Sequence, residues 1–431
     1  MDEYNRVIDF KVEWMVRKYM MGFEELEMED QKLYRCLEAE EHRQQDSLEM
    51  IASESIQPKM ALNLAGSIFN NKTATGSVGK QRLLGAENVD ALERLAAERA
   101  CRIFGAEYAN MLTYSGTVAN FCAYEAVLNP NDPVLALSHS VGAHQSHGGM
   151  GNVSSRFYQF QYFGVDPQTM DIDYDEAEQK AQEYKPKLMV VGSAAYPRNF
   201  DFERLAGIAH RNGALLMVDV AHFTGLIAAG VTPNPFPHAD IVTASTTKTM
   251  CGPHSGFIMC KGKYKEQIEK SVYPGHVASP HLQTIAAMAY VLKRSQTDQF
   301  RELMRQVVRN AQYLCEMLNQ KGFRIFTGGT DCHMFLLDVK PFRLDGVCFA
   351  ESLNRAGITV NSKSIPYEVS EQPGGIRLGT TVLTQRGMKE HEMEEIAELF
   401  YLMGKEQCSD AVIERVKERA LALAKAFPIP Q

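Results

Sequence analysis

The sequence predicts an α/β protein in which a mostly parallel central sheet carries helices on both faces and a smaller α+β domain follows. In the middle of the chain, short continuous apolar runs alternate with amphipathic helical segments, the pattern of buried parallel strands joined by covering helices. From about residue 300 onward, strand-like runs and helices of a different composition follow, and these predict the second domain.

The predicted strands of the central sheet are continuous apolar runs rather than alternating ones, as expected for strands buried on both faces. The runs are PVLAL at 133–137, LMVVG at 188–192, ALLMVDV at 214–220, DIVTA at 240–244 and GFIMC at 256–260.

Amphipathic helices accompany these strands. The segment NVDALERLAAERACRIFG predicts a helix whose apolar face holds Leu92, Leu95, Ala96 and Ile103, with Gly105 as its stop signal. A long helical stretch, LQTIAAMAYVLKRSQTDQFRELMRQVVRNAQYLCEML, leads to the second domain. In that domain FRIFTGG, HMFLLDV and GITVN predict strands, and a last amphipathic helix follows them.

A chain of 431 residues is long enough for two or three domains. We expect an N-terminal helical arm over 1–55, a large cofactor-binding domain over 56–300 and a small C-terminal domain over 301–431. The arm is rich in charge, with apolar residues at helical spacing. It therefore either packs on another subunit or caps the body as a solvated helix.

Composition argues against several classes of protein. A formal net charge of −8 disfavours nonspecific binding to nucleic acid or to an anionic membrane. The nine cysteines are scattered without a C-x-x-C pair, which favours a reduced, cytoplasmic protein over a disulfide framework or a zinc site. No signal-peptide pattern is present, and Asp219 and His222 interrupt the longest apolar stretch, so no membrane span is expected.

One lysine follows a predicted buried strand. Lys248 lies in ASTTKTMCGPHSG, where Ser245 and other hydroxyl residues and glycines surround it. A buried lysine is costly without a partner or a role, and open α/β sheets bind ligands at the carboxyl ends of their strands. The pattern indicates either a covalent link to pyridoxal phosphate or a lysine that only neutralises a phosphate.

A carboxylate ends the preceding predicted strand. Asp219 follows ALLMV, and His222 comes three residues later. A buried carboxylate needs a cationic partner, which in a pyridoxal enzyme is the protonated ring nitrogen. The alternative is an aspartate that caps the next helix. Because Asp219 and Lys248 end neighbouring predicted strands, the cofactor interpretation is favoured.

Two further segments fit a cofactor site. Ser115, Gly116 and Thr117 lead directly into a helix, and such helix N-termini bind phosphate, although many helices begin this way. In GAHQSHGG, His144 is placed to lie on a cofactor ring. The spacing of His144 and His147 also fits a metal site, but acidic and cysteine ligands are lacking nearby, so no metal is expected.

Arg377 follows a glycine pair in the strand-like run GGIRLGTTVLTQRG. Arginine binds carboxylates through two parallel hydrogen bonds. At a domain interface Arg377 would hold the α-carboxylate of an amino acid, and the alternative is a surface ion pair.

Together these segments strongly resemble serine hydroxymethyltransferase, a fold-type-I pyridoxal-phosphate enzyme. The resemblance runs from about Asp30 to about Leu402. The motifs that carry it are MIASES, GSIFNNKTATGSVGK, FGAEYAN, SGTVAN, YFGVDPQTMDIDYDE, KPKLMVVGSAAYPRNFDF, MVDVAHFTGLIAAG, NPFPHAD, KTMCGPHSG, FTGGTDCHMFLLDV, GITVN and GIRLGTTVLTQRGMKE.

The resemblance implies roles at the cofactor. Lys248 forms the covalent link, and Asp219 pairs with the ring nitrogen. His144 stacks on the ring, and His222 contacts the side of its phenolic oxygen. The residues expected around the phosphate are Ser115, Gly116, Thr117 and Ser245.

The resemblance also implies a substrate site and an assembly. Ser53 and Arg377 hold the carboxylate of the amino-acid substrate. The family builds its site across a homodimer, so Gly275 in VYPGHVAS is expected to reach the phosphate site of the neighbouring subunit. A dimer of dimers stays open as an alternative.

The chain departs from the family in the substrate half of the site. Thr73 and Thr75 stand where the family has a tyrosine and then a glutamate, and Arg82 and Leu83 replace a tyrosine pair. The glutamate is the family's principal acid/base for the substrate hydroxyl and for folate. Threonine has no useful pKa for that work.

Further departures concern charge. Thr247 replaces a histidine, His254 an arginine and Lys363 an asparagine that contacts folate, and His276 lies in what is normally a glycine-rich loop. Together with Arg82, these groups either bind a negatively charged far end of the substrate or reflect drift after folate binding was lost.

The function predicted from these observations is pyridoxal-phosphate-dependent cleavage or formation of the Cα–Cβ bond of a β-hydroxy-α-amino acid, with an aldehyde as second substrate in the forming direction. The reaction is of the aldolase or transaldolase type and needs folate weakly or not at all. His144, His147, His254 or a bound water would replace the missing glutamate as base. The alternatives are a tetrahydrofolate-dependent serine or α-methylserine hydroxymethyltransferase, a transaminase or racemase, and a non-catalytic pyridoxal-phosphate-binding regulator.

Overall fold

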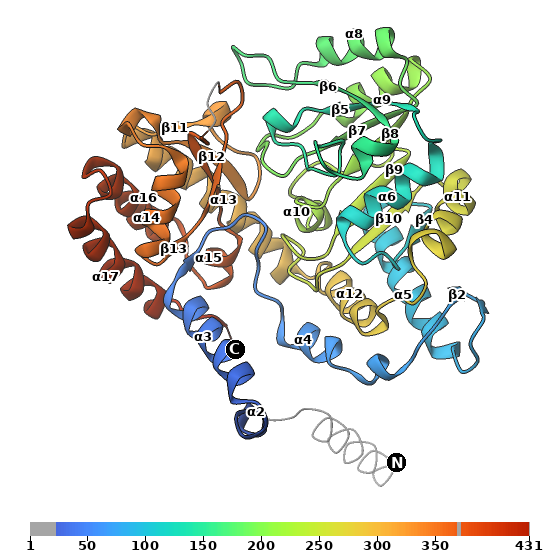
Figure 1. The fold of residues 1–431 in the computed structure, drawn as a ribbon, viewed down its shortest axis with the longest axis horizontal. Coiled ribbons are helices and arrows are strands. Elements are labelled where there is room, and N and C mark those ends of the chain that lie inside the picture. Colours follow the sequence, from blue (N-terminus) through green and yellow to red (C-terminus); the bar gives the residue numbers. More distant parts are fainter. Residues whose placement is uncertain (1–22, 369–371, 431) are drawn as a thin grey trace.

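The computed structural model of the chain describes residues 23–368 and 372–430 (Figure 1). The start of the predicted N-terminal arm therefore lies outside the described residues. One hydrophobic core surrounds a seven-stranded sheet, and a second surrounds a four-stranded sheet built from the C-terminal part of the chain. The three domain boundaries given above stay predictions.

The central sheet is mostly parallel, as predicted. Strands β9, β8, β7, β5 and β6 pair in parallel, while β10 runs antiparallel to both β9 and β4. Every residue of β7, β9 and β10 is buried, so both faces of the sheet are covered. In spatial order the strands are β4 (Tyr108–Asn110), β10 (Gly256–Cys260), β9 (Ile241–Ser245), β8 (Leu215–Asp219), β7 (Leu188–Gly192), β5 (Pro133–Leu137) and β6 (Gln159–Phe163).

The predicted strands agree closely with the observed ones. β5, β7 and β10 match their apolar runs residue for residue, and β8 and β9 differ by one residue at each end. The sequence patterns missed β4 and β6. β4 is very short, and β6 lies at the edge of the sheet with alternating exposure, so neither presents a continuous apolar run.

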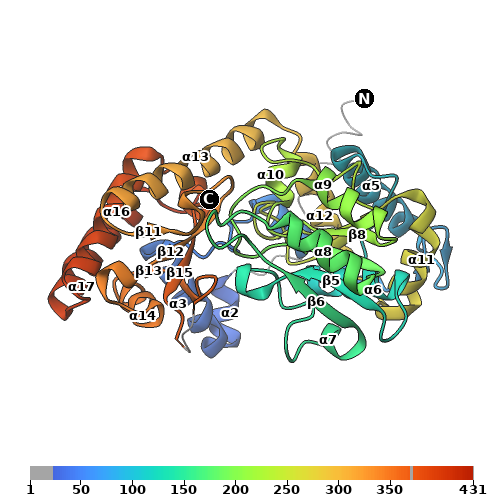
Figure 2. The same ribbon diagram turned by 90° about the horizontal axis from the view of Figure 1, so that it is seen from above.

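Helices pack along the sheet (Figure 2). α6 (Gly116–Val127) contacts β9 and β10, α9 (Phe202–Arg211) contacts β8, and α8 (Tyr174–Tyr184) contacts β5 and β6. Beyond β4, α5 (Glu87–Phe104) packs against α12 (Leu282–Arg294). Figure 2 shows the central sheet and its helices beside the C-terminal unit.

The predicted apolar face of α5 was wrong in part. The helix ends at Gly105 in a left-handed conformation, as expected. However, its buried face holds Val89, Glu93, Ala96, Ala100 and Phe104, and Leu95 is 41% exposed. The buried positions are mostly small residues at helical spacing, and α5 packs against α12.

The long helical stretch predicted before the second domain is two helices. α12 ends at Arg294, and α13 (Asp298–Gln320) begins where the Thr297 side chain accepts a hydrogen bond from the Phe300 backbone N–H. A threonine cap of this kind starts a new helix because it satisfies a free N–H group.

The C-terminal unit contains an antiparallel sheet in the order β11 (Arg324–Ile325), β12 (Met334–Asp338), β15 (Gly375–Gly379) and β14 (Asn361–Lys363). α14 (Gly346–Arg355) packs on β14 and β15, and α13 on α16 (Glu390–Lys405). The single last helix predicted from the sequence was wrong, because α17 (Asp410–Ala426) follows α16 as a separate helix.

The other elements connect these units. The segment GITVN supplies β13, which pairs in parallel with β1 from the N-terminal part of the chain. The remaining elements are α2 (Phe23–Glu29), α3 (Gln31–Asp46), β1 (Leu48–Glu49), α4 (Lys59–Ala65), η1 (Ile68–Asn71), β2 (Gly76–Ser77), β3 (Lys80–Gln81), η2 (His139–Val141), α7 (Ser154–Phe157), α10 (Thr224–Ala228), η3 (Gly262–Tyr264), α11 (Lys265–Lys270), η4 (Ser271–His276), η5 (Phe326–Gly328), η6 (Lys340–Phe342), β13 (Ile358–Thr359) and α15 (Thr381–Gln385).

One buried arginine joins the N-terminal helix α3 to the C-terminal helix α17. Arg386 donates hydrogen bonds to the backbone carbonyls of Gln45 and Ser47 and to those of Ala424 and Phe427. We expect Arg386→Met to lower the free energy of unfolding by about 3 kcal/mol, because several buried carbonyls lose a charged donor at once. Urea denaturation measures this change.

The control for this experiment is Arg415→Met, which removes an exposed ion pair between Arg415 and Glu406. An exposed pair contributes about 0–1 kcal/mol, so this variant should unfold close to the wild type. Equal effects of the two substitutions would contradict the role given to Arg386.

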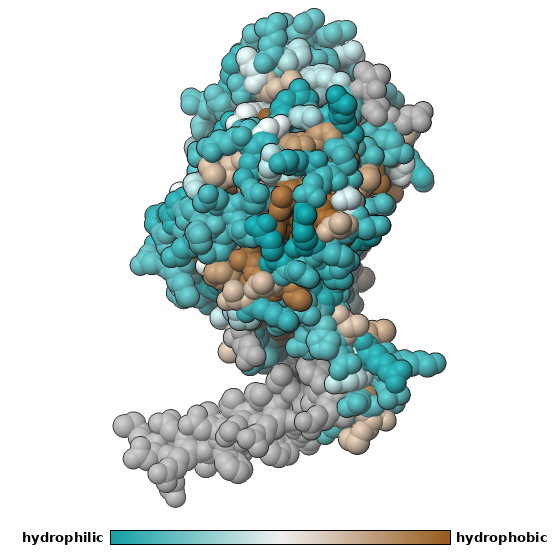
Figure 3. All heavy atoms as spheres, turned by 90° about the vertical axis from the view of Figure 1, so that its left-hand side faces the viewer, coloured by the Kyte–Doolittle hydropathy of each residue, from teal (hydrophilic) through white to brown (hydrophobic). Residues whose placement is uncertain are grey.

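The face of the C-terminal unit is mainly hydrophilic, with small scattered apolar patches (Figure 3). Over the described parts of the chain, no helix is both long and apolar enough to cross a membrane.

Candidate active site

A cavity of about 160 Å³ lies at the carboxyl ends of β7, β8 and β9. This is where parallel α/β sheets usually bind ligands. The predicted site residues in its wall are Ser115, Gly116, Thr117, His144, Asp219, His222, Ser245 and Lys248.

Asp219 is the last residue of β8 and is buried. In the parallel register it lies opposite Gly192 at the end of β7. A Cβ atom at Gly192 would come within 2.4 Å of the Asp219 carbonyl oxygen, so only glycine allows the two strand ends to approach this closely.

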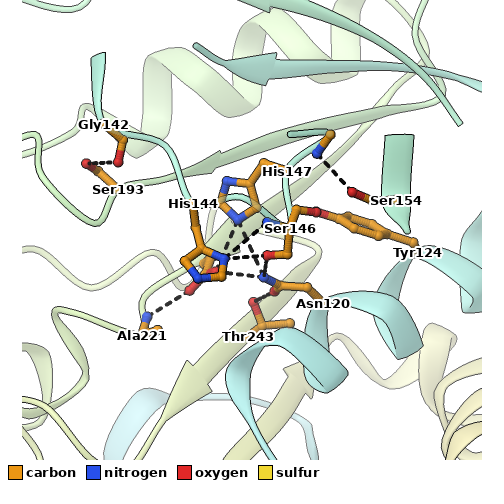
Figure 4. A network of polar contacts seen from close by, with 12 residues as sticks. Asn120, Tyr124, Gly142, His144, Ser146, His147, Ser154, Ser193, Ala221 and Thr243 are labelled. Carbon is orange, nitrogen blue, oxygen red and sulfur yellow. Dashed lines mark hydrogen bonds and ion pairs between the residues drawn. The ribbon is translucent and has the colours of Figure 1, made fainter. Parts of the chain in front are cut away.

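A polar network holds the Asp219 carboxylate, and its members Asn120, His147, Ala221 and Thr243 are labelled in Figure 4. The Asn120 amide donates a hydrogen bond to Oδ2 of Asp219 at 2.8 Å, and Nε2 of His147 lies 3.1 Å from the same oxygen. The backbone N–H of Ala221 donates to Oδ1 at 2.9 Å. Asn120 is itself fixed, because the Thr243 hydroxyl donates to its amide oxygen at 2.6 Å.

These contacts keep Asp219 ionised. Burial alone would raise the pKa of this carboxyl, but the hydrogen bond and positive charge of His147, with His144 and Asn120, hold the pKa well below its usual range. The site thus presents a stable negative charge to the cavity, which suits a cationic group of a ligand.

Lys248 lies in the turn after β9 and is only partly exposed. The turn is held because the Thr246 hydroxyl donates to the Pro253 carbonyl, and the Ser55 hydroxyl donates to the Thr247 carbonyl. Burial lowers the pKa of the Lys248 amine, and the charge of Arg377 adds to this effect, while Asp219 opposes it. A lowered pKa leaves more of the amine neutral and nucleophilic.

The N-terminus of α6 forms another wall. The Ser115 side chain accepts a hydrogen bond from the Val118 backbone N–H and so caps the helix. A Cβ at Gly256 of β10 would lie 2.4 Å from the Ser115 backbone, so this glycine lets the helix start against the sheet. The free N–H groups of the first turn, beside Thr117, face the cavity, and groups of this kind are the donors that commonly bind phosphates.

His144 is held in one tautomer. The Ser146 backbone N–H donates to Nδ1 of His144 at 3.2 Å, so Nδ1 is an acceptor and Nε2 carries the proton. Burial lowers the pKa of His144. Asp219 acts to raise this pKa, but nearby positive groups such as Lys248 lower it further. A neutral ring with one N–H in the cavity is therefore the expected state.

His222 belongs to a buried histidine pair. Nε2 of His333 lies 3.1 Å from the Ala52 carbonyl oxygen and 3.4 Å from Nδ1 of His222. Because a carbonyl only accepts, Nε2 of His333 is the donor, and His222 keeps its proton on Nε2. Burial lowers the pKa of His222 well below its usual value, so it is a neutral donor to the cavity.

Arg377 lies on β15 at the junction of the two units. Its Nη1 donates to the carbonyl of Ala194, a residue in the cavity wall, at 2.6 Å, and its Nε donates to the Asn361 amide oxygen at 3.2 Å. Burial lowers the pKa of Arg377 to about 10. The arginine thus contacts the edge of the cavity, and the surface ion pair considered above is not formed with any described residue.

Besides Arg377, two predicted residues lie outside the cavity wall. Ser53 follows Ala52, whose carbonyl accepts a hydrogen bond from His333. It is therefore linked to the cavity only indirectly, through the backbone of Ala52 and the His333–His222 pair. Gly275 lies in η4 beside Glu125 at the other end of α6. Its expected position in a neighbouring subunit stays a prediction.

The sequence reasoning missed three supporting residues. Asn120 lies inside α6, His333 directly precedes β12, and His147 was considered only as a metal ligand or base. His147 is completely buried and contacts Asp219 instead. The signal for Asn120 was a polar residue on an otherwise apolar helix, because such a residue needs a buried partner. Within the described residues, no cluster of potential metal ligands occurs.

These residues fit a pyridoxal-phosphate enzyme. Lys248 supplies a buried amine, Asp219 a stable carboxylate for a protonated ring nitrogen, and the α6 N-terminus backbone N–H groups for a phosphate. All three face one cavity.

Comparison with protein families agrees with this class. The family model described as serine hydroxymethyltransferase matches residues 26–400. The chain belongs to the serine hydroxymethyltransferase family, whose enzymes use pyridoxal 5′-phosphate and act on amino acids by hydroxymethyltransferase or aldolase chemistry.

Proposed function

We propose that this family member cleaves or forms the Cα–Cβ bond of a β-hydroxy-α-amino acid without requiring tetrahydrofolate. The observation that carries the proposal is the placement of Arg377 against Ala194, at the edge of the cavity that holds Lys248 and Asp219. A carboxylate bound there lies next to the lysine that holds the cofactor, so the substrate is an α-amino acid.

The atoms and electrons of the cleavage balance without any further reagent. In the cleavage direction the β-hydroxyl loses its proton, the Cα–Cβ bond breaks, and the electron pair stays on Cα. Cα then takes up a proton, so HO–CHR–CH(NH₂)–COO⁻ gives the aldehyde RCHO and glycine. Pyridoxal phosphate supplies, when bound, the electron sink that makes a bond at Cα easy to break.

The protein groups have separate tasks. Arg377 binds and orients the α-carboxylate, and Asp219 keeps a positive charge on the ring nitrogen. Of the histidines in the cavity wall, His254 is the candidate base for the β-hydroxyl, since His144 presents a protonated Nε2 to the cavity and acts there as a donor. His147 is disfavoured in that role because it is completely buried against Asp219.

The proposal of weak or absent folate use rests on the hairpin that begins after Thr75. Thr73 and Thr75 precede β2, and the Thr75 carbonyl accepts a hydrogen bond from the Arg82 N–H. The hairpin contacts η4, and Figure 1 shows β2 far from β7 and β8, whose ends line the cavity. A threonine side chain offers no acid/base group there, so the hydroxymethyl transfer to folate lacks its usual catalyst.

The test is turnover of purified enzyme with L-threonine, L-allo-threonine and L-serine, with and without tetrahydrofolate. We expect aldehyde and glycine from a β-hydroxy amino acid at a rate that tetrahydrofolate changes less than about twofold, since folate contributes no transition-state contact. Lys248→Ala protein serves as the control for uncatalysed cleavage.

Other products would overturn the proposal. Turnover of serine that depends strictly on tetrahydrofolate would establish hydroxymethyl transfer. Release of a keto acid or a D-amino acid would point to transamination or racemisation. Ligand binding without any turnover would leave a non-catalytic regulator.

A further inference from the structure

Two cations lie on one face of the C-terminal sheet at the edge of the cavity. Asn361 pairs with Arg377 in the antiparallel register of β14 and β15, and Lys363 is two residues further along β14. Residues two apart on a strand point to the same face. Lys363 and Arg377 therefore share a face, and both side chains are partly buried.

Neither cation has a carboxylate partner among the described residues. Arg377 bonds to a carbonyl and an amide oxygen, which are neutral. The nearest acid on the same segment, Glu368, is engaged by Lys340 and by the backbone N–H groups of Ile365 and Gly374. It is not available to neutralise Lys363.

The positive charge of Lys363 also acts on two histidines, His139 and His144. Burial lowers the pKa of both His139 and His144, and the positive charge of Lys363 contributes to both effects. The pKa of Lys363 is itself lowered by burial and then by Arg377. Lys363 is thus within electrostatic reach of both Arg377 and His144.

A simple amino acid supplies one carboxylate for the two cations on this face of the sheet, Lys363 and Arg377. Within the described part of the chain, Asp219 is the one carboxylate in the cavity wall. A substrate α-carboxylate would neutralise Arg377, which leaves Lys363 as a partly desolvated cation without a carboxylate partner among the residues that the structure describes. Such a charge is unfavourable unless a ligand supplies an anion.

We propose that Lys363 binds a second anionic group, a carboxylate or a phosphate, on the side chain of the amino acid that this site accepts. This inference rests on the proposed function, because it takes Arg377 as the site of the α-carboxylate. It makes the enzyme one that prefers acidic β-hydroxy amino acids and, in the forming direction, anionic aldehydes such as glyoxylate.

The test compares ligands that differ in charge and little in size. Binding of L-aspartate and L-asparagine to the holoenzyme is followed through the absorption of the bound cofactor, and O-phospho-L-serine and L-serine form the phosphate pair. We expect the anionic ligand of one pair to bind about tenfold more tightly, as a charge-assisted hydrogen bond would give. The pair that shows the preference identifies the anion.

Variants assign the preference to Lys363. In Lys363→Met the ratio of the two affinities should fall to about one, and in Lys363→Arg it should be largely retained because a cationic donor stays in place. Lys425→Met, on the exposed surface of α17, is the control and should keep the wild-type ratio.

The outcomes separate this inference from the proposed function. Equal affinities within both pairs, or a preference unchanged in Lys363→Met, would overturn the role of Lys363 even if threonine is cleaved. A loss of tetrahydrofolate binding in Lys363→Met, with no change for the anionic ligands, would also overturn it. Absence of Cα–Cβ cleavage with L-threonine and L-threo-3-hydroxyaspartate would instead contradict the proposed function.

Discussion

Replacing Lys248 with alanine should abolish covalent attachment of the cofactor and lower turnover by at least about 10³-fold, because the amine is the attacking nucleophile. Lys248 is the one lysine in the described wall of the cavity, and its burial lowers the pKa of the amine. No other lysine there can form the bond in its place.

The measurement is reduction of the holoenzyme with borohydride, which fixes the cofactor to the lysine, followed by mass spectrometry of the peptides. The wild type should carry the added mass on the peptide that contains Lys248, and the Lys248→Ala protein should carry none. Cofactor that stays covalently attached in the alanine variant would show that another lysine is used.

A second substitution separates covalent attachment from simple charge neutralisation. Lys248→Arg keeps the positive charge near the phosphate but supplies no amine that forms the bond. If Lys248 only neutralised a phosphate, the arginine variant would bind the cofactor and work almost normally. We expect it to bind cofactor without covalent attachment and to be as inactive as the alanine variant.

The central sheet and the main site residues could be predicted because local patterns determine them. Continuous apolar runs mark β5, β7 and β10 wherever they lie in the fold. Asp219 ends β8 and Lys248 lies just after β9, and parallel strands bring their carboxyl ends to one edge. This placement needs no knowledge of side-chain packing.

Other parts of the site depend on contacts between segments that are distant in sequence. Asn120 reaches Asp219 only because α6 packs on β9 and β10, and His333 meets His222 only because the loop before β12 comes close to the loop after β8. A sequence pattern holds no record of such pairings. The exposed Leu95 illustrates the same limit, since apolar periodicity alone did not say which side of α5 meets α12.

The sequence identified several charged or titratable side chains that a substrate could contact, and the structure shows that some of them are already engaged by other residues. His276 was grouped with Arg82, His254 and Lys363 as a group available to a substrate. In the structure His276 forms an ion pair with Glu125 at 2.5 Å, and the Arg82 guanidinium lies over the ring of Tyr273. His254 lies in the cavity wall and Lys363 at its edge. Of the four groups, these two are therefore the ones available to bind a substrate.

Replacing Asp219 with asparagine should have two opposite effects on the cofactor reaction. It removes the negative charge that pairs with the ring nitrogen, so turnover should fall by about 100-fold, the cost of a lost charge-assisted hydrogen bond in a buried site. It also removes the charge that raises the pKa of Lys248, so this pKa should fall further below its ordinary value.

The sign of the pH effect follows from the attacking species. Covalent attachment needs the neutral amine, so its rate rises as pH increases through the pKa of Lys248. A neighbouring negative charge stabilises the protonated amine, and its removal lowers the pKa. In Asp219→Asn the midpoint of the rate profile should therefore move to lower pH, although the cofactor is bound more weakly.

The rate at which the apoenzyme recombines with pyridoxal phosphate, measured across pH, reports this midpoint directly. Asp240→Asn is the matched control, since Asp240 is also a buried carboxylate but holds Lys261 and His210 at the start of β9. That variant should lose stability and keep the wild-type midpoint. A midpoint that moves to higher pH in Asp219→Asn, or shifts equally in both variants, would show that Asp219 does not act on Lys248 through its charge.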